Sequence, residues 1–377
     1  MKKKQPEPYL SKYLHSRGRM LGLPISGTFE LTSRCNFRCP MCYVHSDAKD
    51  CSVKQQELTA KQWIEIAGQA KEQGMVFALL TGGEPFLRGD FFEIYHAMQR
   101  MGIMVSINSN GSMLSGEIRR QLLENPPARI NISLYGGCVE TYRNMCGNDA
   151  FEQVVENIRV LKEHGIAVCM NLSITPYNHQ DIEKIYAIAT ELEIPVRESA
   201  YMYPSIRVNG EKYGCGNRLL PQEAAACQVK WDKLRFTKKE FEMRAKNMKN
   251  FAAVEERECP VEAEAGVSCR AGSSSFWVTW DGKMVPCGMM PYPKRDILQS
   301  GFVQAWEDIK EETLKIKLSE QCIKCPKKDI CGSCAAVRIT ETGSYEKVPE
   351  YMCEYVDALI EQTINECQSG EGKVDGN

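Results

Sequence analysis

Between residues 26 and 204, six short apolar segments alternate with segments of helical periodicity, and this alternation limits the possible folds more than any other feature. The apolar segments are "GTFELTS" (27–33), "MVFALLTGG", "IMVSINSNG", "ARINISLYGG", "IAVCMNLSITP" and "IPVRESAYMYP". Helical patterns lie between them, at 59–74, in "DFFEIYHAMQRMG", and near 115–123, 150–164 and 179–192. Repeats of this length predict parallel strands joined by right-handed helical crossovers. We therefore expect an α/β fold, either a partial (β/α)6 TIM-like barrel or an open doubly wound sheet.

Polar and glycine-rich residues follow several of the predicted strands directly. They occur in "TGGEP", "NSNG", "LYGG" and "NLSITPYN". Because α/β folds place their binding sites at the carboxyl ends of parallel strands, we expect one functional site at this edge.

The chain has 377 residues and 18 cysteines. The N-terminal "MKKKQPEPYLSKYLHSRGRMLGLPISG" is basic but lacks the continuous apolar segment of a signal peptide, and no run approaches the roughly 18 apolar residues of a spanning helix. A cytoplasmic protein is therefore expected, with cysteines that bind metal rather than form disulfides. The formal net charge of −2 does not favour nucleic acid as a partner, and no membrane partner is expected.

Cys35, Cys39 and Cys42 form a C-x3-C-x2-C run after the first predicted strand. Thiolates are the usual ligands of iron–sulfur clusters, and a cubane cluster normally takes four of them. Three ligands leave one iron open, as a catalytic metal centre requires. Two alternatives remain: Cys51 as a fourth ligand, or a zinc site completed by His45.

The run "CNFRCPMC", followed by Tyr43, resembles the signature of the radical S-adenosylmethionine (radical SAM) superfamily. The resemblance implies that the three cysteines hold a 4Fe–4S cluster, with the amine and carboxylate of SAM on the open iron. It also implies that one electron, supplied by a flavodoxin- or ferredoxin-type donor, cleaves SAM to methionine and a 5′-deoxyadenosyl radical. That radical abstracts hydrogen from the substrate.

The resemblance extends over residues 26–204 and implies further contacts to SAM. "TGGEP" is similar to the family's element for the amino group, "NSNG" to its third-strand element, and "ISLYG" to an element near the ribose or carboxylate. Arg143 is implied for the carboxylate, and the Met202 backbone in "AYMYP" for the adenine. The implied SAM contacts are Tyr43, Gly82, Gly83, Glu84, Asn108, Asn110, Ser133, Arg143, Asn171 and Met202.

The pattern changes after residue 205. Residues 218–250 are mostly helical and charged, 259–353 are dense in cysteine, and a final helix is predicted over 351–367. Bound metal can supply folding energy to such a cysteine-rich region. The predicted parts are an N-terminal extension (1–25), a core (26–204), a helical linker (205–258), a cysteine-rich domain (259–366) and a flexible tail (367–377).

The C-terminal cysteines have the spacing C-x17-C, then C-x2-C-x5-C-x2-C-x18-C. The two C-x2-C pairs suit a zinc ribbon, which would leave Cys269, Cys287 and Cys353 unexplained. With "DGKMVPCG", the region resembles the SPASM domain of radical SAM enzymes, which holds two auxiliary 4Fe–4S clusters.

The SPASM resemblance assigns the cysteines to two groups. An outer cluster would take Cys322, Cys325, Cys331 and Cys353, and an inner cluster would take Cys269, Cys287 and Cys334. The second pair, Cys331 and Cys334, has the spacing C-x2-C where the SPASM domain is expected to have C-x3-C. This departure weakens the assignment of Cys334 to the inner cluster. The fourth inner ligand is either Cys259 or absent, leaving an open site.

SPASM-type radical SAM enzymes mostly modify peptides, so the resemblance implies crosslinking or oxidation of a ribosomally synthesised peptide. The sulfatase-maturating branch is expected to have an aspartate just after the inner-cluster cysteine, but Gly288 stands there and the next carboxylate is Asp296. That branch remains an alternative, as do an enzyme acting on a small molecule or sugar and a non-catalytic iron–sulfur or zinc protein.

Two functional assignments stay open in the sequence. No catalytic acid or base is identified, although Tyr135, Tyr203 and Arg207 lie in the right region. Residues 1–26 are too short for a fused leader-binding domain, so a separate leader-binding protein, or the core surface with 218–250, would recognise a leader.

Overall fold

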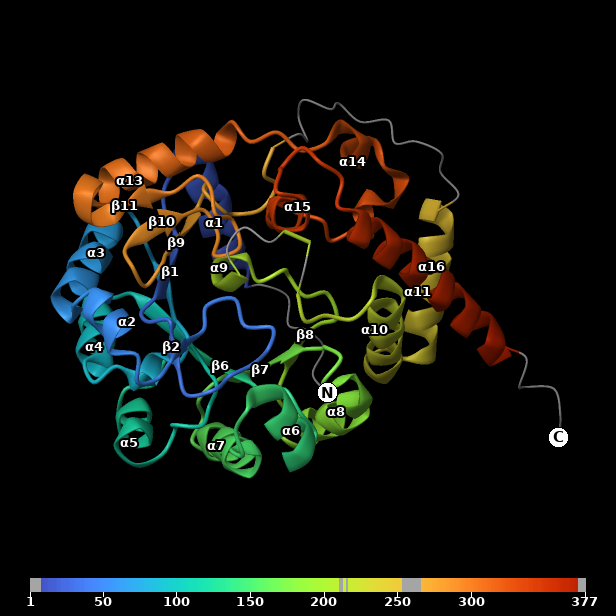
Figure 1. Ribbon diagram of the computed structural model, residues 1–377, viewed down its shortest axis with the longest axis horizontal. Helices are drawn as coiled ribbons and strands as arrows, with labels where there is room; N and C mark the ends of the chain where they lie inside the picture. The colour runs from blue at the N-terminus through green and yellow to red at the C-terminus, as the bar shows by residue number, and fades with distance from the viewer. Residues whose placement is uncertain (1–7, 210–212, 215, 253–265, 372–377) are drawn as a thin grey trace.

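The computed structural model describes residues 8–209, 213–214, 216–252 and 266–371 (Figure 1). All six predicted strands form, and they pair in parallel in the order β1-β4-β5-β6-β7-β8. Their bounds are β1 Ser26–Glu30, β4 Phe77–Thr81, β5 Met104–Ser109, β6 Arg129–Ser133, β7 Val168–Ser173 and β8 Val196–Ser199. The predicted α/β class is confirmed.

Helices cover the outer side of these strands, as Figure 1 shows. Those of the core are α2 Cys51–Gln56, α3 Ala60–Glu72, α4 Phe91–Arg100, α5 Gly116–Glu124, α6 Val139–Cys146, α7 Phe151–Glu163 and α8 Ile182–Glu191, with 3₁₀ turns η1 Pro85–Leu87 and η2 His179–Asp181. Trp63 of α3 is fully buried and meets the ring of Phe29 edge-on at 6.0 Å. Such contacts place the outward-facing side chains of the strands in the main core.

The C-terminal region extends the same sheet, which the sequence did not predict. Strand β9 (Ser275–Val278) pairs in parallel with β1, and β10 (Lys283–Val285) and β11 (Arg295–Asp296) follow antiparallel, giving nine strands. A strand edge with unpaired backbone groups is a site of unwanted pairing, and β9 covers the free edge of β1. The core and the cysteine-rich part therefore share one sheet.

A long helix in the cysteine-rich part was also not predicted. Helix α13 (Ile297–Leu314) is bent at Gly301, whose φ of 74° is not helical, and this break hides its apolar periodicity in the sequence. It packs beside α3, where the Phe302 amide donates to Gln69 Oε1 at 3.1 Å. The Trp306 indole donates to the Gly22 carbonyl at 2.8 Å.

The remaining elements lie before, between and after those already described. They are α1 Tyr9–Leu21, β2 Arg34–Cys35, β3 Ser46–Asp47, α9 Ile206–Asn209, α10 Pro221–Arg235, α11 Lys238–Ala252, α14 Glu320–Lys324, η3 Pro326–Asp329, α15 Ala335–Thr342 and α16 Glu350–Glu371. The last helix continues beyond the predicted end at Cys367, so residues 368–371 are helical rather than part of a tail.

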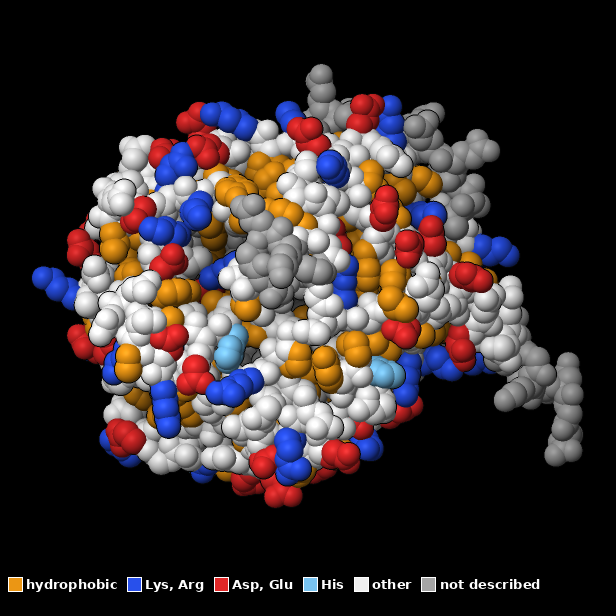
Figure 2. Space-filling view, viewed as in Figure 1, with side chains coloured by type: hydrophobic (Ala, Val, Ile, Leu, Met, Phe, Trp, Pro, Cys, Tyr) orange, Lys and Arg blue, Asp and Glu red, His pale blue; other side chains and the backbone are white. Residues whose placement is uncertain are grey.

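The described surface mixes charges of both signs. Figure 2 shows Lys and Arg side chains interspersed with Asp and Glu over one face of the molecule. Among the described residues, no helix combines the length and the apolarity needed to cross a bilayer.

Candidate active site

The three clustered cysteines lie on a loop that a short parallel ladder closes. Arg34–Cys35 (β2) pairs with Ser46–Asp47 (β3), so the ends of the loop are held together directly after β1. Both ends of the ladder are anchored, since the Ser46 amide donates to the Ser33 carbonyl at 2.8 Å and Arg34 pairs with the buried Glu57 at 2.7 Å. The loop is therefore built as a fixed cradle.

The thiols of this loop are neutral unless a cation binds. Burial raises the pKa of Cys35 to about 12 and that of Cys42 to about 11, and the neighbouring thiols of the group add to both shifts. A hydrogen bond with the Cys146 thiol, together with burial, raises the pKa of Cys39. Mutually close, buried thiols of this kind ionise when a metal binds, which fits the donor set of an iron–sulfur cluster.

The two alternative fourth ligands have different surroundings. Cys51 is exposed at the start of α2, where its thiol contacts the Lys49 carbonyl at 3.5 Å. His45 has a buried Nε2 that meets no hydrogen-bond partner in the part of the chain that the structure describes, and it lines a cavity described below.

The "TGGEP" segment packs backbone to backbone against the start of the cysteine loop. The Gly83 amide donates to the Thr32 carbonyl at 2.8 Å, and the Glu84 amide donates to the Arg34 carbonyl at 2.8 Å. A Cβ at Gly83 would lie 2.4 Å from the Arg34 carbonyl oxygen. Only glycine permits this approach, so the segment is part of the cradle.

The Glu84 carboxylate ties the second strand to the third. It is fully buried and accepts hydrogen bonds from Ser109 Oγ at 3.0 Å, the Asn110 amide at 2.8 Å and the Phe86 amide at 3.2 Å. Burial raises its pKa to about 7, and the hydrogen bonds offset only part of that rise.

Several predicted SAM contacts meet on the inner side of the strands. Asn110 Nδ2 lies 3.8 Å from Cys35 Sγ, and Asn108 accepts a hydrogen bond from Asn131 at 2.7 Å. Ser133 and Asn171 are register partners on neighbouring strands. This side is therefore polar where it adjoins the cysteine loop.

Arg143 stands apart from this group, and the Met202 backbone has a hydrogen-bond partner of its own. The guanidinium of Arg143 is more than half exposed and pairs with Asp149 at the surface. The Met202 carbonyl accepts a hydrogen bond from Arg218 Nη1 at 3.4 Å. The structure does not bring Arg143 together with the other predicted residues.

A buried network that the motifs did not reveal lies beside the loop. Arg207 forms a bidentate ion pair with Glu30, whose side chain is fully buried, and Trp277 Nε1 donates to the same carboxylate at 3.2 Å. The Tyr43 ring lies 5.5 Å from the Arg207 guanidinium and 6.3 Å from the Trp277 ring. The sequence singled out Tyr43 by resemblance and Arg207 by position, but it gave no sign that they meet Glu30 and Trp277.

The C-terminal cysteines gather in two groups. Burial and then the charges of Cys334 and Cys269 raise the pKa of Cys287 to about 11. Burial and then the other three thiols of its group raise the pKa of Cys353 to about 11. The structure thus brings together Cys269, Cys287 and Cys334 in one place and Cys322, Cys325, Cys331 and Cys353 in another.

Two further observations bear on these groups. Cys259 lies outside the described residues. Within the described ranges, no three Cys, His, Asp or Glu side chains converge as the ligands of one ion would. Thiolates around a cluster bind different iron atoms, so they need not meet at one point.

Arg207 links the first cysteine loop to the inner C-terminal group. Its charge acts on both Cys42 and Cys287 and offsets part of the rise that burial causes in the pKa of each thiol. Directly after Cys287, Gly288 packs under the indole of Trp277. The two thiol groups therefore flank one compact set of side chains.

A cavity of about 400 Å³ opens beside this set. Its walls are His45 and Ser46 of the cysteine loop, Arg207, Asp281 of the β9–β10 turn and Gly288. This cavity touches both the first cysteine loop and the segment after Cys287. A substrate bound in it would therefore lie beside both segments.

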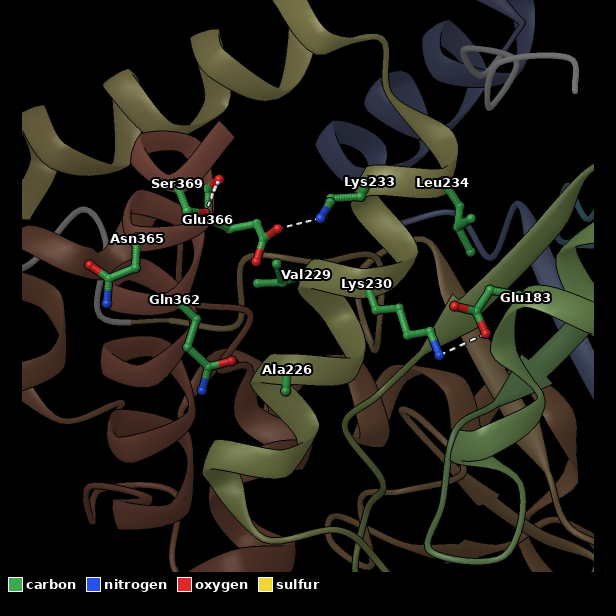
Figure 3. Close-up of a pocket in the computed structure, with 10 residues that line it drawn as sticks. All are labelled: Glu183, Ala226, Val229, Lys230, Lys233, Leu234, Gln362, Asn365, Glu366 and Ser369. Atoms are coloured by element: carbon green, nitrogen blue, oxygen red, sulfur yellow. Dashed lines mark hydrogen bonds and ion pairs between the residues drawn. The ribbon is translucent and has the colours of Figure 1, made fainter. Parts of the chain in front are cut away.

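A larger hollow of about 730 Å³ lies elsewhere, between α8, α10 and α16 (Figure 3). Ion pairs between Lys230 and Glu183 at 2.8 Å, and between Lys233 and Glu366, hold its walls together. None of the predicted site residues lines it.

The site defines the class of the protein. Three thiols in a cradle at the carboxyl end of a parallel sheet agree with a family model described as "Radical SAM superfamily", which matches residues 29–189. The chain therefore contains a radical SAM domain over these residues and is an enzyme. The radical SAM family binds SAM and a 4Fe–4S cluster.

Comparisons with individual proteins extend beyond this domain. The chain is 26% identical to "AdoMet-dependent heme synthase" of Methanosarcina barkeri (strain Fusaro / DSM 804), over 89% of this chain and 98% of that protein. It is 26% identical to "Antilisterial bacteriocin subtilosin biosynthesis protein AlbA" of Bacillus subtilis (strain 168), over 83% and 67%.

Solved structures show the same fold. Streptococcus suis SuiB bound to precursor peptide SuiA aligns with a TM-score of 0.63 at 16% identity, covering 94% of this chain and 83% of that one. The AdoMet-bound anSMEcpe structure aligns with a TM-score of 0.62 at 17% identity, covering 92% and 99%. Both alignments include the cysteine-rich C-terminal part as well as the core.

Proposed function

We propose that this radical SAM enzyme cleaves SAM reductively and abstracts hydrogen from a ribosomally synthesised peptide, which it crosslinks or oxidises. One observation supports the proposal above the others: Arg207 and its cavity lie between the first cysteine loop and the inner C-terminal thiols. In this arrangement the radical would form on one side of this cavity, and the electron lost by the substrate would leave on the other side.

In this proposal Cys35, Cys39 and Cys42 hold the cluster that supplies the electron for SAM cleavage. Their burial and mutual repulsion fit thiols that ionise only on metal binding. The "TGGEP" backbone and the polar inner face of the strands would orient SAM. Arg143 is the least supported contact, because its guanidinium already pairs with Asp149.

The C-terminal thiols are proposed to hold two auxiliary clusters rather than one zinc ion. A zinc ribbon would use both C-x2-C pairs, so Cys331 and Cys334 would share one metal. Instead, the Cys334 thiol contacts the Tyr203 hydroxyl at 3.9 Å and acts on Cys287, whereas Cys331 interacts with Cys322 and Cys325. This separation favours two sites.

A peptide substrate is supported by the relatives and by the site. The subtilosin biosynthesis protein shares 26% identity, and the SuiB structure is one with a bound precursor peptide. Sulfatase maturation is less favoured, because the position of the expected aspartate is Gly288 and the Trp277 indole fills the adjacent space.

A second candidate is a radical SAM reaction on a small molecule. The heme synthase relative matches over 98% of its own length, further than the subtilosin protein does. Lys294 in the cavity wall would suit a carboxylate-bearing substrate.

The test begins with anaerobic reconstitution and metal analysis. About twelve irons per chain, with 5′-deoxyadenosine formed on reduction, are expected for three clusters. Cys42→Ala should lose SAM cleavage, whereas Cys227→Ala, a buried cysteine outside the three groups, should retain it. Zinc in place of iron, or no SAM cleavage by the intact chain, would refute the proposal.

The substrate class is tested with peptides encoded beside the gene and with a haem precursor. A peptide that loses hydrogen in a SAM-dependent manner, seen by mass spectrometry, supports peptide modification. Conversion of the haem precursor alone would establish the second candidate instead.

A further inference from the structure

Helix α1 exposes an apolar stripe along its length. The side chains concerned are Tyr9 (84% exposed), Leu10 (66%), Tyr13 (51%), Met20 (72%) and Leu21 (59%). Their spacing places them on one side of the helix, opposite the buried His15 and Gly18. An exposed apolar group of this size on a small region marks an interaction surface.

The same helix carries three cations, Lys12, Arg17 and Arg19, and no acidic residue. No Asp or Glu lies between Tyr9 and Leu21, and among the described residues Lys12 and Arg17 form no ion pair. Arg19 donates to the main-chain carbonyls of Ser268 at 3.1 Å and Val267 at 3.3 Å, and within the described ranges it pairs with no carboxylate. The apolar stripe is therefore bordered by positive charge.

The opposite side of α1, which carries His15, adjoins the inner group of C-terminal thiols. A cavity of about 660 Å³ is lined by Lys12, His15 and Arg19 of α1 on one side and by Cys269 and Cys287 on the other. None of the described residues that line it is acidic. A partner seated on the apolar stripe would thus be separated from the thiols proposed to bind the inner auxiliary cluster by the width of this helix, about 10 Å.

We infer that α1 is the docking surface for an acidic one-electron carrier protein of the flavodoxin or ferredoxin class. Charge complementarity identifies the occupant, because electrostatic steering by unpaired cations favours an acidic partner, and electron-transfer complexes use small interfaces. The inference rests on the proposed function, in which the carrier loses one electron and SAM gains it. The carbon–sulfur bond of SAM then breaks to give methionine and the 5′-deoxyadenosyl radical.

The test compares two ways of delivering the electron to the reconstituted full chain. Reduced flavodoxin must dock, whereas dithionite need not. Tyr13→Glu/Arg17→Glu should raise the KM for flavodoxin roughly tenfold and leave the dithionite-driven rate of 5′-deoxyadenosine formation unchanged. Met243→Glu/Lys246→Glu, an equal change on the exposed side of α11, should alter neither quantity.

Binding of oxidised flavodoxin, measured by thermophoresis at low and high salt, gives a readout independent of SAM chemistry. The α1 variant should bind about tenfold more weakly, and salt should weaken the native complex more than the variant complex. An unchanged affinity would overturn the inference, as would an equal loss of the dithionite-driven rate, which would mean that α1 only supports the fold.

Loss of self-association or of binding to anionic vesicles, with unchanged carrier affinity, would assign the surface to a second copy or to a membrane instead. An intact chain that binds flavodoxin through α1 but does not cleave SAM would refute the proposed function and leave the docking surface standing.

Discussion

Gly288→Ala should destabilise the protein because the added methyl group meets an immobile ring. A Cβ at this position would lie 2.8 Å from Trp277 Cε2, 2.9 Å from Cζ2 and 3.0 Å from Cδ2. The indole is fixed, since Trp277 belongs to strand β9 and its Nε1 donates to the buried Glu30 carboxylate at 3.2 Å. Gly288 has no left-handed φ, so packing rather than backbone strain decides the result.

The expected cost follows from these contacts. Overpacking a well-filled site costs about 1–3 kcal/mol. If the ring moves enough to lose its hydrogen bond to Glu30, a bond to a charged acceptor adds roughly 1.5–3 kcal/mol. We therefore expect a loss of about 2–4 kcal/mol in the free energy of unfolding.

Urea denaturation of the single and double variants measures this cost. In a Trp277→Ala background the methyl group has room, so Gly288→Ala should cost at least about 1 kcal/mol less than it does in the native chain. Gly89→Ala is the matched control, because a Cβ there meets nothing within 4 Å. An equal cost of Gly288→Ala in both backgrounds, or no cost in either, would refute the packing argument.

Three further predictions concern buried charge and metal ligands. Burial raises the pKa of Glu84 to about 7, so the contribution of this group to stability is complete below its ordinary pKa of 4.5 and is lost as the pH rises through 7. Urea titrations should show a loss of about 3 kcal/mol in the free energy of unfolding from this group by about pH 8. Glu84→Gln should remove that pH dependence. Arg207→Met should cost about 3–5 kcal/mol in unfolding free energy by leaving Glu30 buried without its cation, and adding Glu30→Gln should recover part of that loss; an additive double variant would contradict this. Cys353→Ala should remove about four irons per chain, whereas Cys227→Ala should remove none, and iron analysis of both distinguishes a ligand from a packed thiol.

The fold of the core could be predicted because its signal is local. Each of the six strands is a short apolar segment bounded by turn residues, and all six form and pair in parallel. Strand β9 could not be placed in this way, because its partner β1 lies at the other end of the chain. The bend at Gly301 similarly concealed α13, whose apolar residues do not keep one period across it.

The candidate site likewise combines residues that local sequence signals identify with residues that only distant contacts bring together. Cysteine spacing and the "TGGEP" motif identify the cradle, since those residues are neighbours in sequence or follow adjacent strands. The network of Glu30, Arg207 and Trp277 could not be predicted, because it joins β1, α9 and β9. Arg143 was expected near SAM from a motif, but the structure places its side chain in a surface ion pair, which a motif cannot show.

By itself, the sequence determined the parallel α/β class and the supply of thiol ligands, because periodicity and close spacing act over a few residues. The spacing of the cysteines left open how those thiols are shared out, and the tertiary structure decides it. Cys331 and Cys334 are three positions apart, yet Cys334 joins Cys287 while Cys331 joins Cys322 and Cys325. Short spacing permits two cysteines to share one site but does not require it, and the packing of distant segments determines which thiols meet.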